Sequence, residues 1–234
     1  MSEAINPPSF VFLNAEFHCE EEHTMAMTVL LCCAVGYLLG NINPAFLIAR
    51  RKGYDARFDG SGNAGASNAF ILAGKAAFFL TAAFDILKAF IACRLCRRLF
   101  PALSVAEQLG GVACILGHMF PVVLHFRGGK GLASLGGVAL SWSWKYFLLL
   151  LALAAAIAFV TNYLCFVAPT MSLVFPGLYY WETRFLLAAL ILLVPAVPIF
   201  IKHMENFRRI KAGTEVRMSY LWDKEGELKR IGRL

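Results

Sequence analysis

Charged residues are scarce in this chain of 234 residues, of which they make up 16%. A soluble domain has about 25% charged and about 45–50% apolar residues, whereas 59% of this sequence is apolar and its mean hydropathy is +0.64. The composition therefore excludes a disordered chain, a soluble Rossmann enzyme and a large extramembrane domain. Because one membrane-spanning helix takes about 20 apolar residues, the sequence predicts an all-α, polytopic membrane protein of about seven spans.

Sequence patterns for metal binding and for disulfide bonds are also missing. Cys93 and Cys96 have CxxC spacing, but no second pair follows at zinc spacing, and most of the seven cysteines lie inside apolar runs. We interpret the cysteines as small buried side chains. An HExxH motif and a G-x-S-x-G nucleophile elbow are absent too, and the apolar spans contain no acidic cluster. We therefore expect neither a metal ion nor any other cofactor.

The two ends of the chain differ from its apolar middle. Residues 1–24 are polar and acidic, and they lack the basic start of a signal peptide. We interpret them as an extension that precedes the true start of translation, at Met25 or Met27. Residues 25–215 are then the membrane domain, and residues 216–234 form a basic cytoplasmic tail for which anionic lipid is a candidate partner.

Seven apolar runs predict helices, at residues 26–49, 72–96, 105–126, 132–143, 146–161, 163–181 and 184–202. The fourth run is short for a full crossing and predicts a tilted or partial helix. Most of the 22 lysines and arginines fall on the side that holds the C-terminus. The positive-inside rule places that side in the cytoplasm and the N-terminus outside, although the cluster from Arg94 to Arg98 falls on the outer side. We interpret the net charge of +7 as this topology signal and not as a sign of nucleic-acid binding.

The first polar segment on the cytoplasmic side runs from Gly60 to Asn68 and reads GSGNAGASN. Glycines let the backbone approach a ligand closely and expose successive N–H groups. If the segment opens a helix, these groups and the positive end of the helix dipole suit an anion. A flexible polar loop that caps the next helix is the alternative interpretation.

The second segment, RGGKG from Arg127 to Gly131, separates two apolar runs. Glycines beside a lysine suit phosphate, because the backbone can come close and the lysine adds a mobile positive charge. The GxxxxGK[ST] spacing of a P-loop is absent. The alternative is a positively charged turn that only anchors the topology.

The third segment follows the last apolar run and contains His203, Asn206 and, further on, Glu215. If the run continues as a helix, His203 and Asn206 share one face near the membrane surface. A histidine there can take or share a proton near neutral pH, although a solvated helix end is the alternative. Together the three segments predict a site for phosphate-bearing substrates where lipid meets cytoplasm, with His203 as general base or polarising donor.

Charged residues inside the predicted spans form a separate group. Asp85 and Lys88 lie three residues apart on one helix face, and Glu107 and His118 lie in the next run. Such residues usually face a partner or a cavity. Two interpretations follow, structural ion pairs and the lining of a pathway. His118 precedes Pro121, and we interpret it as a hydrogen-bond partner of a freed carbonyl.

Taken together and in this order, the motifs resemble the PlsY family of bacterial integral-membrane acyltransferases, from about Gly36 to Glu215. The residues that carry the resemblance are Gly60-Ser61-Gly62-Asn63, Gly65-Ala66, Asn68, Phe84-Asp85, Leu87-Lys88, Gly117-His118, Phe120-Pro121, Gly128-Gly129-Lys130-Gly131, His203, Glu205-Asn206 and Gly213-Thr214-Glu215. The resemblance implies seven spans in the bacterial cell membrane and an active site that faces the cytoplasm. It also implies transfer of an acyl chain from acyl phosphate to the 1-hydroxyl of glycerol 3-phosphate, without a metal ion or a covalent acyl-enzyme. The products are lysophosphatidic acid, for phospholipid biosynthesis, and phosphate.

The same resemblance implies roles for residues at matching positions. Its catalytic residues are Ser61, which holds a phosphate, and His203 and Asn206, which orient or deprotonate the attacking hydroxyl. Its substrate-binding residues are Gly62, Asn63, Asn68, Gly128, Gly129, Lys130, Gly131 and Glu215. Lys130 neutralises a phosphate and Glu215 fixes the C-terminal loop, so that catalysis rests on positioning and charge stabilisation.

The chain departs from the family at two positions. Many members have an arginine where this chain has Ile71, and a serine where it has Cys165. Losing a charged hydrogen bond to phosphate costs about 1.5–3 kcal/mol, so another cation is needed, and the candidates are Arg50, Arg51 and Arg57. Otherwise the protein is a catalytically silent or acceptor-altered paralogue that binds phosphorylated lipid precursors. A small transporter is a third interpretation, although no internal repeat is visible in the sequence.

Overall fold

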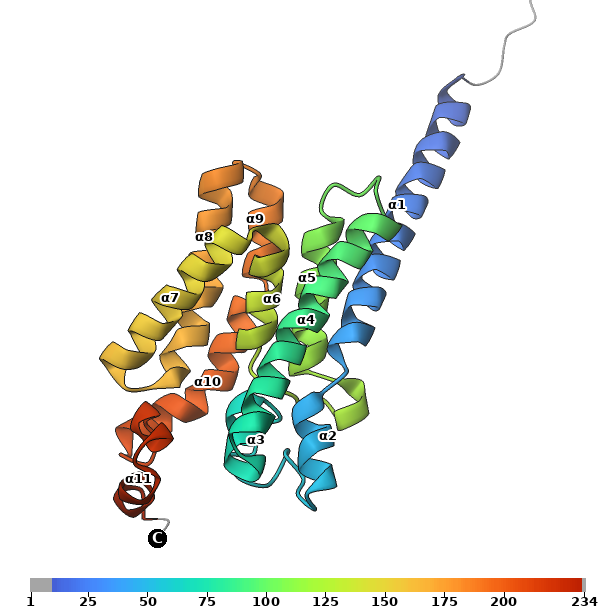
Figure 1. Cartoon of the computed structure of the whole chain (residues 1–234). Coiled ribbons are helices and arrows are strands. Elements are labelled where there is room, and N and C mark those ends of the chain that lie inside the picture. Colours follow the sequence, from blue (N-terminus) through green and yellow to red (C-terminus); the bar gives the residue numbers. More distant parts are fainter. Residues whose placement is uncertain (1–9, 233–234) are drawn as a thin grey trace, which may run out of the picture.

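The computed structural model describes residues 10–232, and the regular structure of these residues is entirely helical (Figure 1). The α-helices are α1 (Phe10–Gly40), α2 (Pro44–Arg51), α3 (Ala66–Ala73), α4 (Lys75–Leu99), α5 (Ala106–Met119), α6 (Leu132–Trp142), α7 (Trp144–Thr161), α8 (Val167–Thr183), α9 (Leu186–Leu193), α10 (Ala196–Lys211) and α11 (Lys224–Arg230). Short 3-10 helices are η1 (Val122–Leu124), η2 (Leu164–Phe166) and η3 (Met218–Leu221). The all-α fold that the sequence predicts is therefore confirmed.

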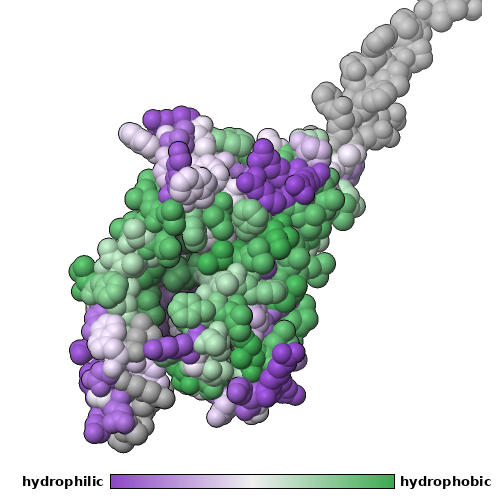
Figure 2. Space-filling view, viewed as in Figure 1, coloured by the Kyte–Doolittle hydropathy of each residue, from purple (hydrophilic) through white to green (hydrophobic). Residues whose placement is uncertain are grey.

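Six stretches of the described residues are long and apolar enough to cross a membrane: His23–Arg51, Lys75–Leu99, Ala106–Leu124, Trp144–Thr161, Leu164–Thr183 and Leu186–Lys211. Helix α6, which is the fourth apolar run of the sequence, has only 11 residues. In Figure 2, hydrophobic residues cover the middle of the molecule and hydrophilic residues gather toward its two ends, as expected for a protein that sits in a bilayer. Seven crossings and the orientation of the termini stay predictions.

The first apolar run, predicted as one helix over residues 26–49, is divided into α1 and α2. Asn43 caps α2, because its Oδ1 accepts from Phe46 N at 2.9 Å, and Pro44 occupies the first turn, where no N–H donor is needed. The Asn43 Nδ2 also donates to Ala64 O at 2.9 Å. The break between the helices therefore attaches α2 to the first polar segment.

Small residues bring α1 and α5 close together. A β-carbon on Gly36 would lie 2.2 Å from Gly110 O, and one on Gly117 would lie 2.3 Å from Tyr37 O, so neither position has room for a side chain. Glycine contacts of this kind let helix backbones approach in a membrane, where lipid is as apolar as the helix surface. The packing fixes the end of α5, which leads to the second polar segment.

Both ends of the chain are partly described. Residues 1–9 of the predicted extension lie outside the described residues, and the rest of it belongs to α1, which runs on to Gly40. A translation start at Met25 or Met27 stays a prediction. The C-terminal tail contains η3 and α11, and it buries the side chains of Met218 and Tyr220. Residues 216–232 of the tail are thus a folded part of the molecule.

Candidate active site

The segment from Gly60 to Asn68 forms a loop and the first turn of α3, and the fully buried Asn68 organises it. The Asn68 Nδ2 donates to Ala56 O and Asp59 O, both at 3.0 Å. Its Oδ1 accepts from the Ser61 N–H at 2.8 Å. Asn68 therefore supports the loop from inside, and the exposed Ser61 has its hydroxyl, not its N–H, available for a ligand.

Gly62 and Asn63 form the turn that precedes α3. Gly62 is exposed and has a φ of +69°, in the left-handed region that favours glycine. Asn63 is half-buried, and its carbonyl accepts from Gly65 N at 2.8 Å. A β-carbon on Gly65 would lie 3.8 Å from the Cα of Gly129. The two glycine-rich segments, which are distant in the sequence, therefore adjoin in the fold.

The second glycine-rich segment, called the Lys130 loop below, packs against the end of α5. Gly128 N donates to Met119 O at 3.2 Å, and Gly129 N donates to His118 O at 3.1 Å. A β-carbon on Gly128 would lie 2.0 Å from His118 O, and one on Gly129 would lie 2.0 Å from His118 Nε2. Close packing therefore requires both glycines, and their N–H groups bind the protein itself.

Lys202 of α10 anchors the same loop. Its Nζ donates to Met119 O at 2.7 Å, Gly128 O at 3.2 Å and Gly129 O at 3.1 Å. Gly131, with a φ of +88°, then starts α6. The sequence did not predict this role of Lys202, because a lysine at the end of an apolar run is equally typical of a cation that reaches toward the interface.

Polar side chains from the second and third polar segments form one connected set. The Lys130 Nζ donates to Asn206 Oδ1, and the Asn206 Nδ2 donates to Glu215 Oε1 at 2.6 Å. Arg209 Nε donates to the other carboxylate oxygen of Glu215 at 2.6 Å. Removal from water lowers the pKa of Lys130, and the positive charge of Arg209 lowers it further, while Glu215 opposes this shift. An ammonium has three N–H donors, so Lys130 keeps two for an anion.

Helix α10 buries both His203 and Asn206, one turn apart. The His203 Nδ1 lies 2.7 Å from Ile199 O. Because a carbonyl only accepts hydrogen bonds, Nδ1 carries the proton, and in the neutral ring Nε2 has the free lone pair. The imidazole thus has a fixed tautomer that leaves Nε2 as a base.

Three charged or polar side chains inside the predicted spans meet in a buried network. Lys88 Nζ lies 2.6 Å from Asp85 Oδ1 and 3.0 Å from His118 Nδ1. All three residues are at most 3% exposed. Lys88 also donates to Ile42 O at 2.7 Å, in the break between α1 and α2. Since His118 contacts Gly129, the network connects this break to the Lys130 loop and acts as a structural cluster rather than as a pathway lining.

The three arginines that could replace the family arginine either pair with another residue or lie exposed. Arg57 binds Asp55, with Nη2 2.7 Å from Oδ2 and Nε 3.0 Å from Oδ1, and this pairing lowers the pKa of Asp55. Arg50 and Arg51 lie exposed in the last turn of α2. Ile71 is half-buried in α3. None of these contacts assigns one of the three arginines to a phosphate.

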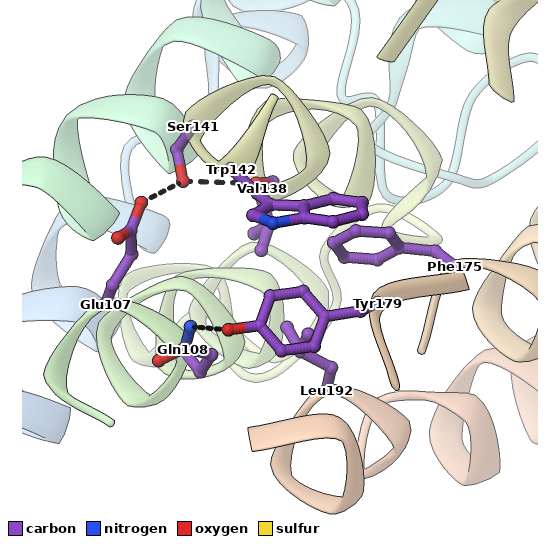
Figure 3. Close-up of a pocket in the computed structure, with 8 residues that line it drawn as sticks. All are labelled: Glu107, Gln108, Val138, Ser141, Trp142, Phe175, Tyr179 and Leu192. Atoms are coloured by element: carbon purple, nitrogen blue, oxygen red, sulfur yellow. Dashed lines mark hydrogen bonds between the residues drawn. The ribbon is translucent and has the colours of Figure 1, made fainter. Parts of the chain in front are cut away.

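A second polar pocket lies at the other end of α5 (Figure 3). Ser141 Oγ donates to Glu107 Oε1 at 2.8 Å, and Gln108 Nε2 donates to Tyr179 OH at 2.8 Å. The cavity has a volume of about 10 Å³, which is room for about one water molecule. The pocket is too small for a substrate, so the set around Lys130 is the candidate active site.

Comparison with known proteins gives a consistent result. A family model described as "Glycerol-3-phosphate acyltransferase" matches residues 30–213. "Glycerol-3-phosphate acyltransferase 1" of Deinococcus radiodurans is 37% identical over 201 residues, which are 83% of this chain and 98% of the relative. "Glycerol-3-phosphate acyltransferase" of Geobacter sulfurreducens is 37% identical over 193 residues, which are 80% of this chain and 96% of the relative.

Solved structures resemble the fold as well. A crystal structure of PlsY (YgiH), an integral membrane glycerol 3-phosphate acyltransferase, in its glycerol 3-phosphate form superposes with a TM-score of 0.71 at 31% identity, over 82% of this chain and 96% of that one. The lysophosphatidic acid form of PlsY gives a TM-score of 0.68 at 31% identity, over 81% and 94%.

Proposed function

The chain belongs to the glycerol-3-phosphate acyltransferase family, and we propose that it transfers an acyl chain from acyl phosphate to the 1-hydroxyl of glycerol 3-phosphate. The products are lysophosphatidic acid, used in phospholipid biosynthesis, and phosphate. One observation carries the proposal: Lys130 of the second polar segment and Asn206 and Glu215 of the third form one hydrogen-bonded set. His203 lies on the same helix as Asn206, so a base and a cation come from adjoining positions.

The geometry supports a direct transfer. His203 Nε2 takes the proton of the 1-hydroxyl, whose oxygen forms a bond to the acyl carbon. The bond between that carbon and the phosphate oxygen breaks, and the phosphate leaves with the electron pair. Lys130 stabilises the charge on phosphate, Asn206 and Glu215 hold the lysine in place, and the Ser61 hydroxyl is a further donor. Gly62 and Asn63 belong to the same loop as Ser61, which Asn68 supports from inside.

An apolar cavity between α4, α6, α7 and α8 suits part of the acyl chain. Its volume is about 140 Å³, and its lining includes Ile86, Leu132, Gly136, Phe147 and Met171. A dry protein cavity of about 150 Å³ accepts a benzene-sized group, so this one has room for about six carbon atoms. Because Leu132 is two residues after Lys130, the cavity begins near the proposed phosphate site and extends along α6.

The proposal also includes the location. The protein is a multi-pass protein of the bacterial cell membrane. Helix α6, the fourth apolar run, adds a partial crossing to the six long ones, and the N-terminus lies outside. The active site faces the cytoplasm. Six long apolar helical stretches support the membrane placement. The basic residues that precede the first polar segment and follow the third support the cytoplasmic orientation of the site.

The test is an activity measurement on purified protein in detergent. Acyl phosphate and glycerol 3-phosphate are supplied, acyl-CoA serves as the comparison donor, and Lys130→Ala serves as the control variant. We expect lysophosphatidic acid from acyl phosphate only, and we expect Lys130→Ala to abolish it. A folded protein that produces no lysophosphatidic acid would contradict the proposal.

A second candidate is a silent or acceptor-altered paralogue that binds phosphorylated lipid precursors. It is favoured by Ile71 at the position of the family arginine, together with the pairing of Arg57 with Asp55. This candidate predicts ligand binding without turnover of glycerol 3-phosphate. Turnover that is lost in a His203→Ala variant would rule it out. The family assignment argues against a transporter, because its members are named as acyltransferases.

A further inference from the structure

The described part of the C-terminal tail, residues 216–232, is folded against the candidate active site although the family match ends at residue 213. The alignments to the two relatives cover 96–98% of the relatives' own lengths but only 80–83% of this chain. In Figure 1 the tail, with α11, lies beside the C-terminal end of α10. The tail therefore lies beyond the residues that the family model matches.

Arg230 of α11 binds the loop that carries Glu215. Its Nη1 donates to Gly213 O and its Nη2 to Glu215 O, both at 2.5 Å. Arg230 is itself held by Glu227, with Nε 2.9 Å from Oε2 and Nη2 2.5 Å from Oε1. The Glu227 Oε1 also accepts from Arg217 N at 2.7 Å. One guanidinium thus joins α11 to the backbone on both sides of Thr214.

The other half of the tail binds the elements that flank the site. Met218 N donates to Asn162 O at 2.8 Å, and Ser219 N donates to Asn162 Oδ1 at 3.1 Å. The Tyr220 ring packs edge-on against Phe70 of α3, with 5.8 Å between ring centroids. Tyr220 is 8% exposed. The tail therefore contacts α3, which begins in the first glycine-rich segment, as well as the Glu215 loop.

We propose that Arg230 and Tyr220 are positioning residues for the reaction, through which the tail aligns Glu215 and α3 around the substrate phosphate. The proposal rests on the proposed function. Arg230 holds the backbone of Glu215, the Glu215 carboxylate holds Asn206, and Asn206 accepts from Lys130. Tyr220 holds Phe70, the neighbour of Ile71, so the tail orders α3 where the family arginine is missing.

The experiment compares Arg230→Ala with Lys229→Ala, and Tyr220→Ala with Trp222→Ala, because Lys229 and Trp222 are exposed neighbours in the same tail. We expect Arg230→Ala and Tyr220→Ala to raise the KM for glycerol 3-phosphate roughly tenfold, with a smaller change in kcat. The two control variants should match the wild type.

Conservative variants separate positioning from general folding. Tyr220→Phe keeps the ring and should keep the wild-type KM. Arg230→Lys keeps the charge but not the planar fork that reaches two carbonyls, and its KM should stay raised. A raised KM in Tyr220→Phe equal to that in Tyr220→Ala would overturn the role of the ring contact.

A second measurement does not depend on activity. Hydrogen exchange of the Thr214 and Glu215 amides, both of which donate to Arg209 O, should accelerate in Arg230→Ala and not in Lys229→Ala. If the wild-type protein makes no lysophosphatidic acid, the proposed function fails while the exchange rates still decide whether Arg230 holds this loop. Equal exchange and equal KM in Arg230→Ala and Lys229→Ala would overturn the inference.

Discussion

The Nε2 atom of His118 lies where a side chain on Gly129 would have to go, 2.0 Å from the position of a β-carbon there. The other ring nitrogen of His118 lies 3.0 Å from Lys88 Nζ. A side chain of the buried charge network thus packs directly against the loop that carries Lys130. The position of the proposed phosphate-binding lysine therefore depends on charges in α4 that do not themselves belong to the candidate site.

Gly129→Ala should reduce acyl transfer roughly tenfold to hundredfold, because overpacking costs about 1–3 kcal/mol and the added methyl group must push the Lys130 loop away from His118. His118→Ala removes the ring that the added methyl group would meet. The double variant, with Gly129→Ala and His118→Ala, should therefore lose less activity than the sum of the losses in the two single variants. The measurement is the rate of lysophosphatidic acid formation. Gly177→Ala, in an open position, is the control, and strictly additive losses would contradict the contact.

Lys88→Met should strongly destabilise the protein, because Asp85 would keep a buried charge without its partner, at a cost of about 3–5 kcal/mol. Adding Asp85→Asn removes that charge and should recover part of the loss. Thermal unfolding in detergent measures both effects. Lys75→Met, at the exposed start of α4, is the matched control. Equal unfolding temperatures for Lys88→Met and Lys75→Met would contradict the network.

Activity should fall at alkaline pH, because Lys130, the proposed phosphate-binding residue, can pair with phosphate only while it is protonated. Burial and Arg209 lower the pKa of Lys130 below the ordinary 10.5, so the charge is lost as pH rises through this lowered value, before a free lysine would lose it. The measurement is kcat/KM for glycerol 3-phosphate against pH. In Lys130→Arg, whose guanidinium stays charged to above about pH 12, the decline should move to higher pH. An unmoved decline would assign it to another group.

Ile71→Arg restores the arginine that many family members have at this position. If the tail only partly replaces it, we expect the KM for glycerol 3-phosphate to fall roughly tenfold, the worth of one charged hydrogen bond to phosphate. Steady-state kinetics measure this change, with Ile71→Leu as the control for side-chain volume. No fall in KM would show that the phosphate lies away from this turn of α3.

Gly136→Leu should shift the donor preference toward shorter acyl chains, because its side chain enters the cavity of about 140 Å³. A β-carbon on Gly136 would lie 3.4 Å from Phe147, which is ordinary contact distance, so the added bulk fills space without forcing the backbone. The measurement is the relative rate with acyl phosphates of different length. Gly177→Leu is the control, and an unchanged preference would place the chain elsewhere.

The sequence alone predicted much of the fold and the outline of the site. The apolar runs predicted the helical membrane fold, and the short fourth run predicted the short helix α6. The spacing of His203 and Asn206 predicted that one helix carries both on one face, as α10 does. Sequence patterns did not predict the break before Pro44, because an amide that caps a helix across a turn resembles any other polar residue in an apolar run.

What the sequence determined by itself is local: helix-forming apolar runs, glycines where the backbone must come close, and polar residues that hydrocarbon rejects. The tertiary structure decided which groups meet. It turned Asn68 inward, brought Lys202 to two carbonyls of the Lys130 loop and to the carbonyl of Met119, and folded the tail so that Arg230 reaches Glu215. These contacts depend on how helices distant in the sequence pack together, and a periodic pattern specifies the buried face of a helix but not the neighbour that buries it.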